Sequence, residues 1–145
     1  MKKTNYMKKF KLALVAMTLV MLWSCGKYEE GPAFSLRSKT GRLVGTWELE
    51  QILVGGVQQQ LSGTSEITFE RDGTYTSKIV DGIDSDESTG TWEFGDGKET
   101  VKVTFSALGG SFTIENDILR LTNSEYWLKN SNTNGTETVY HYKAK

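Results

Sequence analysis

Two side chains of this 145-residue chain stand out for nucleophilic or acid–base chemistry, its only cysteine, Cys25, and its only histidine, His141. Catalysis by a serine or thiol needs a histidine beside the nucleophile. His141 lies between two tyrosines in a stretch that is typical of a last strand, so we interpret it as a strand-surface residue. The chain has no phosphate loop, no dinucleotide fingerprint and no zinc-type spacing of cysteine and histidine. We therefore expect no enzymatic activity, no metal site and no cofactor.

The position of Cys25 indicates another chemistry. Five lysines and no acidic residue precede an apolar run over residues 12–23, as in an export signal. This run has 12 residues, whereas a membrane-spanning helix needs about 20. Without a second cysteine, a disulfide would have to be intermolecular. The segment Leu22-Trp23-Ser24-Cys25 resembles the bacterial lipobox, which implies removal of residues 1–24 and attachment of fatty acyl chains such as palmitate to Cys25. Cleavage at another site, giving a soluble secreted domain, is the alternative.

Charge and length limit the partners of the mature chain. Removing residues 1–24 takes away five of the 17 basic residues and none of the 18 acidic ones, which leaves a net charge of −6. Binding to a phosphate backbone needs concentrated Lys and Arg, so nucleic acid is not an expected partner. Anionic lipid head groups would repel this protein, and attachment to a bilayer therefore depends on acylated Cys25. The remaining length fits one domain, which we expect to be a monomer.

Residues 25–42 have the composition of a flexible linker, with glycines, the only proline and charges of both signs. The segment Lys27-Tyr28-Glu29-Glu30 follows the cysteine and is similar to the short acidic tags that route some lipoproteins of Gram-negative gut bacteria to the outer cell face. A solvated spacer is the alternative. The sequence thus predicts a lipoprotein of the cell envelope, in the outer membrane, facing the periplasm or the outside.

From residue 43 to 145 the chain alternates between apolar and polar residues in short runs, which is typical of an antiparallel all-β domain. Asp72-Gly73 is the strongest turn signal, and Gly55-Gly56, Gly95-Asp96-Gly97, Gly109-Gly110 and Asn116-Asp117 are further candidates. The predicted strands are residues 44–54, 65–71, 74–81, 89–95, 99–106, 111–115, 118–129 and 137–144.

The same alternation separates the two faces of each strand. One face is polar, and the other carries the apolar residues Trp47, Leu49, Leu53, Ile67, Phe69, Tyr75, Ile79, Trp92, Phe94, Val101, Val103, Phe105, Phe112, Ile114, Leu119 and Leu121. Burial on one face of every strand describes a sheet wrapped around an apolar interior. About eight antiparallel strands linked by hairpins can close into an up-and-down barrel and so lose their edges.

Several segments of this domain are similar to bacterial lipocalin-like lipoproteins. Gly45-Thr46-Trp47 resembles the glycine-x-tryptophan signature of the first lipocalin strand, and residues 66–75, 90–94 and 119–121 resemble later strands. The resemblance implies an eight-stranded lipocalin-like barrel over residues 43–145 in which Gly45 and Trp47 form a structural plug at the closed end. It also implies a basic residue over Trp47, for which Lys143 or Arg120 is available.

The densest acidic segment, residues 81–87, offers oxygen ligands for calcium but departs from the EF-hand pattern at its sixth and twelfth positions. We expect a solvated hairpin loop there.

The main functional hypothesis is a membrane-anchored lipocalin-like lipoprotein that binds a small apolar or amphipathic ligand in its barrel. The alternative is a non-catalytic interaction module with a filled barrel that displays residues 81–88 and 129–135 to a protein or glycan. Aromatic side chains suit such a ligand. The candidate ligand-binding residues are Tyr75, Trp92, Phe94, Phe105, Tyr126, Tyr140 and Tyr142.

Overall fold

The computed structural model describes residues 36–107, 110–131 and 135–145. The signal peptide, Cys25 and the acidic tag lie outside the described residues, so the expectations for them stay predictions. The elements are helix α2 (Lys39–Leu43), strands β1 (Gly45–Val54), β2 (Val57–Gln58), β3 (Thr64–Phe69), β4 (Thr74–Asp81), β5 (Asp84–Phe94), β6 (Thr100–Ala107), β7 (Gly110–Leu121), β8 (Glu125–Ser131) and β9 (Glu137–Ala144), and the 3₁₀ turn η2 (Asp96–Lys98).

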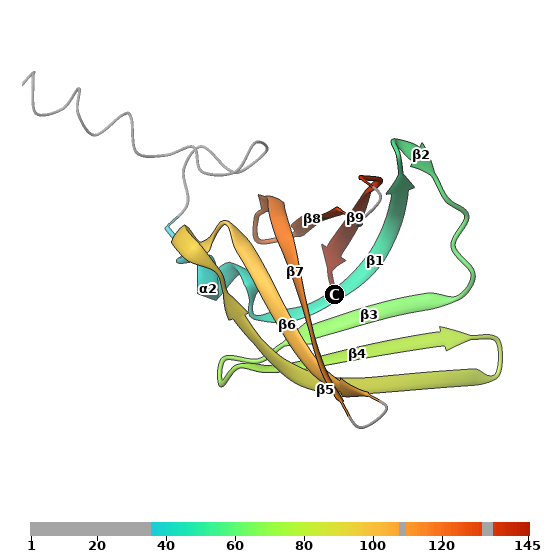
Figure 1. The fold of residues 1–145 in the computed structure, drawn as a ribbon, viewed down its shortest axis with the longest axis horizontal. Helices are drawn as coiled ribbons and strands as arrows, with labels where there is room; N and C mark the ends of the chain where they lie inside the picture. The colour runs from blue at the N-terminus through green and yellow to red at the C-terminus, as the bar shows by residue number, and fades with distance from the viewer. Residues whose placement is uncertain (1–35, 108–109, 132–134) are drawn as a thin grey trace, which may run out of the picture.

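Eight of these strands form a closed antiparallel barrel, as the sequence predicted (Figure 1). β1 pairs with β3, each following strand pairs with the next one, and β9 returns to pair with β1. β2 is a short extension that folds back on the end of β1 through the Gly55-Gly56 turn, where both glycines have positive φ. The all-β, eight-stranded up-and-down barrel expected from the alternating pattern is therefore confirmed.

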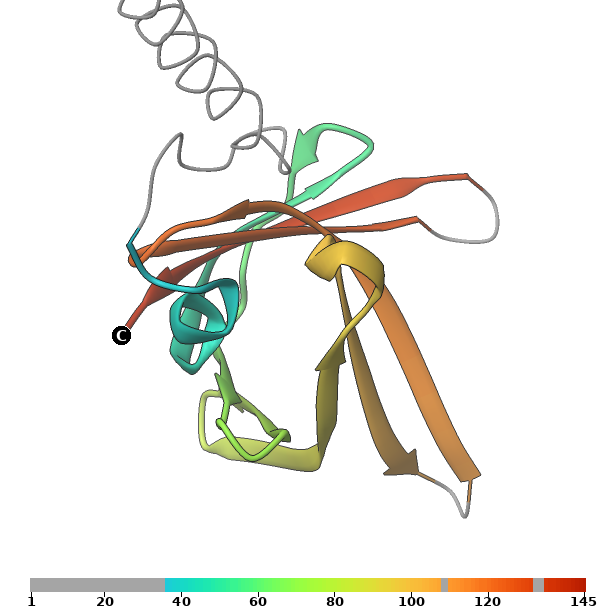
Figure 2. The ribbon, with the colours of Figure 1, turned by 90° about the vertical axis from the view of Figure 1, so that its left-hand side faces the viewer.

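The barrel is narrow at one end and splayed at the other. Only the first residues of β1, from Gly45 to Glu48, pair with β3, whereas residues 47–54 pair with β9. β5 pairs with β6 from Gly90 onward, although β5 begins at Asp84 and pairs with β4 from its first residue. The hairpins therefore extend beyond the closed part of the barrel and diverge, as Figures 1 and 2 show.

Two tight features of the fold depend on glycine. At the β3–β4 turn, Gly73 has a φ of 93°, and the Asp72 carboxylate accepts a hydrogen bond from the Thr74 amide at 2.9 Å. Strand β5 makes a corner in Figure 2, and Gly90 is its first residue paired with β6; a Cβ atom placed on Gly90 would lie 2.2 Å from the carbonyl oxygen of Thr104. Glycine inside a strand is typical of such barrel corners.

Two segments that the sequence assigned to turns or loops are strand. Asn116-Asp117 lies inside β7, and the β7–β8 turn is at Thr122-Asn123-Ser124, where the Thr122 hydroxyl accepts hydrogen bonds from the following amides. Residues 84–88 belong to β5, and the β4–β5 hairpin turns within Gly82-Ile83. The predicted loop over residues 81–88 is therefore wrong. The Gly109-Gly110 candidate falls partly outside the described residues.

Irregularities in two strands change which side chains face inward. The register of β1 against β9 shifts between Leu49 and Gln51, and the register of β7 against β8 shifts between Ile118 and Arg120. An extra residue reverses the alternation beyond it. Leu53 consequently pairs with Val139 on the outer face, and Ile118 takes the buried position that the alternation gave to Leu119.

Helix α2 covers the narrow end of the barrel, in a segment that the sequence treated as linker. Ser38 caps the helix by accepting a hydrogen bond from the Gly41 amide at 3.0 Å. At the other end of the helix Leu43 is fully buried, and its carbonyl accepts a hydrogen bond from the Trp47 indole at 2.8 Å. Five residues are too few to show a helical period, so the alternation gave no sign of this helix.

Candidate ligand-binding cavity

A cavity of about 950 Å³ lies inside the splayed half of the barrel. One wall comes from β3 and β4, and the other from β7, β8 and β9. The volume lies in the range of about 300–1,000 Å³ that small-molecule sites occupy. The lining residues are Ser65, Ile67, Tyr75, Ser77, Ile79, Thr113, Ile114, Glu115, Asn116, Leu128, Asn130, Tyr140 and Tyr142.

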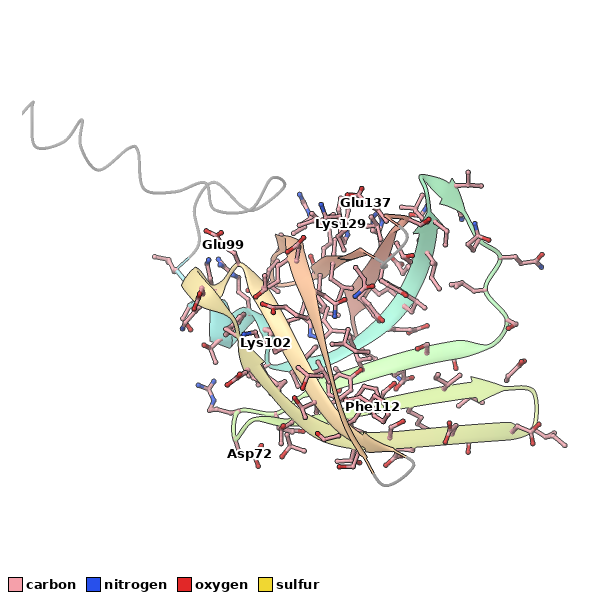
Figure 3. The ribbon with its side chains drawn as sticks, in the orientation of Figure 1. Asp72, Glu99, Lys102, Phe112, Lys129 and Glu137 are labelled. Atoms are coloured by element: carbon pink, nitrogen blue, oxygen red, sulfur yellow. The ribbon has the colours of Figure 1, made fainter. Side chains whose placement is uncertain are left out.

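The cavity opens along β7. Backbone pairing between β7 and β8 ends at Asp117 with Lys129, whereas β7 begins at Gly110, so residues 110–116 extend past the last pair. Phe112 and Ile114 lie on the inward face of this stretch, yet they are 48% and 42% exposed. Figure 3 shows the side chain of Phe112 on β7. Inward apolar side chains with this exposure show that the interior is open to solvent along β7.

The lining alternates apolar groups with neutral polar groups. Ile67, Ile79, Ile114 and Leu128 provide the apolar part. Two serines, two asparagines and three tyrosines provide hydroxyl and amide groups. Asn130 Nδ2 donates a hydrogen bond to Asn116 Oδ1 at 2.9 Å, just beyond the last backbone pair of β7 and β8. This bond links β7 to β8 within one wall, where the backbones of the two strands part.

Two tyrosines of the cavity, Tyr75 and Tyr142, have raised pKa values. Burial raises the pKa of Tyr142 far above its ordinary value, and the neighbouring phenols of Tyr75 and Tyr140 raise it further. Burial also raises the pKa of Tyr75, with a smaller opposing effect of a hydrogen bond with Ser77. All three tyrosines line the same cavity, where a phenol hydroxyl can donate and accept hydrogen bonds.

The structure brings only part of the candidate ligand-binding set to the cavity. Tyr75, Tyr140 and Tyr142 line it. Phe105 stacks on Phe112 near the opening, with ring centroids 6.1 Å apart. The other three candidates, Trp92, Phe94 and Tyr126, belong to the aromatic core below the cavity.

That aromatic core forms the floor of the cavity. Phe69 contacts Tyr75, Trp92 and Tyr126 at centroid distances of 5.4, 5.5 and 5.8 Å. Tyr126 also stacks on Tyr142, which belongs to the lining, at 5.9 Å. The cavity is thus bounded on this side by packed aromatic rings of the core.

The sequence analysis missed the polar half of the lining, namely Ser65, Ser77, Asn116 and Asn130. The signal was available in part, because Ser65 and Ser77 fall on the inward face of the predicted strands. Serine at an inward position was not taken as informative. Asn116 was assigned to a turn, and the inward face of β8 could not be deduced without its register.

The predicted plug residue Trp47 is 2% exposed and packs on Tyr126 at 5.5 Å. Gly45 precedes it with a φ of 145°. The expected cation over Trp47 is not supplied by Arg120 or Lys143. Arg120 lies over the ring of Trp127 at 5.1 Å, and Lys143 forms an ion pair with Glu50 at 3.3 Å. Both lie on the outer face, because the buried Leu121 and Tyr142 beside them point inward.

The remaining reactive groups lie outside the cavity. His141 stacks on Trp127 with ring centroids 4.1 Å apart and planes 9° apart, on the outer face. Within the described residues no group of three or more His, Cys, Asp or Glu is placed to hold a metal ion. No helix among these residues has the length and apolar character needed to cross a bilayer. Among the described residues, the cavity is the candidate for a ligand-binding site.

Comparison with known proteins gives matches of structure. No protein-family model and no curated protein sequence matches the chain. The crystal structure of a lipocalin-like protein from Bacteroides uniformis ATCC 8492 matches with a TM-score of 0.52 at 15% identity, covering 69% of this chain and 97% of that chain. Insecticyanin from the tobacco hornworm Manduca sexta matches with a TM-score of 0.58 at 12% identity, covering 82% and 68% of the two chains. Together with the closed eight-stranded order, these matches show that the chain has the lipocalin-like fold.

Proposed function

We propose that this protein is a lipoprotein of the cell envelope that holds a small apolar or amphipathic ligand inside its barrel. The observation that supports this function is the open cavity of about 950 Å³, lined by apolar and neutral polar side chains and closed below by aromatic rings. Concave sites with a few polar groups on an apolar background are the usual form of small-molecule sites. The lipocalin-like protein and insecticyanin share the fold that presents such a cavity.

The membrane attachment in this proposal comes from the sequence. Cys25 at the end of an export signal would carry the acyl chains, and residues 26–35 would leave about 10 residues between the lipid and the first described residue. The barrel would be held near the outer membrane, on the periplasmic or the outer side. Such a tether keeps a binding protein close to lipids and to molecules that partition into them.

The alternative function, an interaction module with a filled barrel, is less well supported. It required a solid interior, and the barrel has an open one. It also relied on loops at residues 81–88 and 129–135, but residues 84–88 and 129–131 are strand. The ligand-binding function therefore agrees better with the residues that the structure describes.

A fluorescent probe can test ligand binding. The mature chain with Cys25→Ser, so that no acyl chain competes for the cavity, would be titrated with the uncharged probe N-phenyl-1-naphthylamine. We expect a saturable rise in fluorescence. Ser77→Phe places a ring in the cavity and should weaken binding, whereas Thr76→Phe, the neighbouring outward residue of β4, should not. Equal binding by both variants would contradict a site inside the barrel.

Mass spectrometry tests the anchor independently. The protein purified from its native membrane should begin at Cys25 and carry the mass of its acyl chains. An unmodified cysteine, or an N-terminus elsewhere, would contradict the lipoprotein assignment and leave the cavity unaffected. The same spectrum under native conditions would reveal a small molecule that is purified with the protein.

A further inference from the structure

The cavity limits its ligand by the charge of its lining as well as by its volume. The seven polar residues that face inward among the lining are serine, asparagine and tyrosine, and none of them is charged at neutral pH. Glu115 borders the cavity, but its carboxylate accepts a hydrogen bond from Thr100 at 2.6 Å and lies 3.8 Å from Lys102 on the outer face. The interior thus offers many hydrogen-bonding groups without a countercharge.

Every Lys and Arg of the five lining strands lies on the outer face of the barrel. Lys78 lies between two lining residues of β4, and Lys129 between two of β8, so strand alternation points both of them outward. Lys129 forms an ion pair with Glu137 at 3.4 Å. Figure 3 labels both residues, at the same edge of the barrel. Arg120 and Lys143 complete the set, with carboxylate partners at 2.8 and 3.3 Å.

The β4–β5 side of the barrel adds a carboxylate and no inward cation. Asp86 of β5 lies directly opposite the lining residue Ile79, and side chains of directly opposed residues share one face of a sheet. An anionic head group would therefore find a carboxylate on this side and no cation on the lining strands. Burial of a carboxylate or phosphate without a partner is strongly unfavourable.

The asparagine pair provides a recognition element for a neutral head group. The Asn130–Asn116 bond uses one hydrogen of one amide and one lone pair of the other. The second amide hydrogen of Asn130, both amide hydrogens of Asn116 and the remaining oxygen lone pairs stay available for further bonds. Both amides line the cavity next to the apolar residues Ile114 and Leu128, so one molecule can contact polar and apolar groups together.

We propose that the cavity selects uncharged amphiphiles whose head group carries hydroxyl or amide functions, and that it rejects amphiphiles with an anionic head group. This inference rests on the proposed function, because it assigns the ligand class of the same site. The observation that supports it is the composition of the lining. Asn116, Asn130 and the cavity tyrosines provide neutral hydrogen-bonding groups without a cation among them.

Two probes with the same apolar tail test the inference. Glycerol monolaurate and laurate would each compete with N-phenyl-1-naphthylamine for the mature Cys25→Ser chain, at about pH 8, where laurate is ionised. We expect glycerol monolaurate to bind at least about tenfold more tightly, because only laurate must bury an unpaired charge. Laurate binding as tightly as the neutral lipid would overturn the inference and leave ligand binding intact. Failure of both lipids and of the fluorescent probe to bind would overturn the proposed function as well.

An asparagine variant tests the head-group contact. Asn116→Leu keeps a similar side-chain size and removes the amide, so it should weaken glycerol monolaurate binding by about two- to tenfold, as expected for one lost hydrogen bond. The circular dichroism spectrum and the urea unfolding midpoint of Asn116→Leu, compared with those of the parent chain, show whether the barrel is folded. Asn123→Leu in the β7–β8 turn is the matched control and should change neither lipid binding nor folding. Unchanged glycerol monolaurate binding by Asn116→Leu would contradict the role of the pair.

Discussion

Substitution of Gly90 by alanine tests the corner of β5, on which closure of the barrel depends. A Cβ atom at this position would lie 2.2 Å from the Thr104 carbonyl oxygen, 3.0 Å from the Thr104 carbonyl carbon and 3.2 Å from the Phe105 Cα atom. An ordinary contact is about 3.5 Å, so β5 would have to move by more than about 1 Å from the backbone of β6. All three of these atoms belong to the backbone of β6, so no flexible side chain can move aside to relieve the contact.

The energetic cost follows from the pairs that this movement disturbs. Gly90 pairs with Phe105 at the first β5–β6 position, next to Thr91 with Thr104. Loss of one or two ladder hydrogen bonds, at about 0.5–1.5 kcal/mol each, together with strain gives about 2–4 kcal/mol. This is a large part of the total stability of about 5–15 kcal/mol of an ordinary domain.

Urea unfolding followed by tryptophan fluorescence measures the effect. The midpoint for Gly90→Ala should fall while the slope stays the same, as expected for a loss of stability without a change in surface exposed on unfolding. Thr89→Ala, the exposed outward residue beside it, should cost less than about 1 kcal/mol. If Gly90→Ala is no less stable than Thr89→Ala, the close approach of β5 and β6 at this corner is refuted.

Three further predictions concern other parts of the molecule. Trp47→Phe should lower the free energy of unfolding by about 2–3 kcal/mol, because it removes buried ring area and the hydrogen bond to Leu43, whereas the outward Trp127→Phe should cost less than about 1 kcal/mol. The free energy of unfolding should fall as the pH rises above about 10, because tyrosine in the unfolded chain releases its proton there while burial keeps Tyr142 protonated in the folded state. Urea unfolding across this pH range should show a smaller fall for Tyr142→Phe, and an equal fall would contradict the raised pKa of Tyr142. Cys25→Ser should move the protein from the membrane fraction to the soluble fraction of cells, and retention in the membrane fraction would contradict acylation of Cys25.

Much of the barrel could be predicted because its strands alternate regularly. Ile67 and Phe69 on β3, and Val101 and Val103 on β6, are buried as their alternation indicated. Asp72-Gly73 forms the predicted turn because the aspartate carboxylate and the positive φ of glycine both stabilise it. Where local patterns and tertiary structure agree in this way, the sequence is sufficient to predict the strands, their buried faces and their turns.

The errors arose where tertiary contacts overrode local patterns. Asn116-Asp117 has the residue types of a turn, but Asn116 bonds to Asn130 on the neighbouring strand β8, and Asp117 pairs with both Thr100 and Lys129. The register shifts in β1 and β7 exchange inward and outward positions without a mark in the composition. Because the cavity lies beside these places, its polar lining was the part least accessible to prediction.

Nuclear magnetic resonance locates the ligand most directly. Backbone amide shifts of the mature Cys25→Ser chain would be recorded before and after addition of glycerol monolaurate. If the barrel interior is the binding site, the shifts should be concentrated at Ser77, Asn116, Asn130 and Tyr140 around the cavity. Shifts concentrated instead on the outer face around Trp127 and His141, or none at saturating lipid, would contradict the claim that the barrel holds its ligand inside.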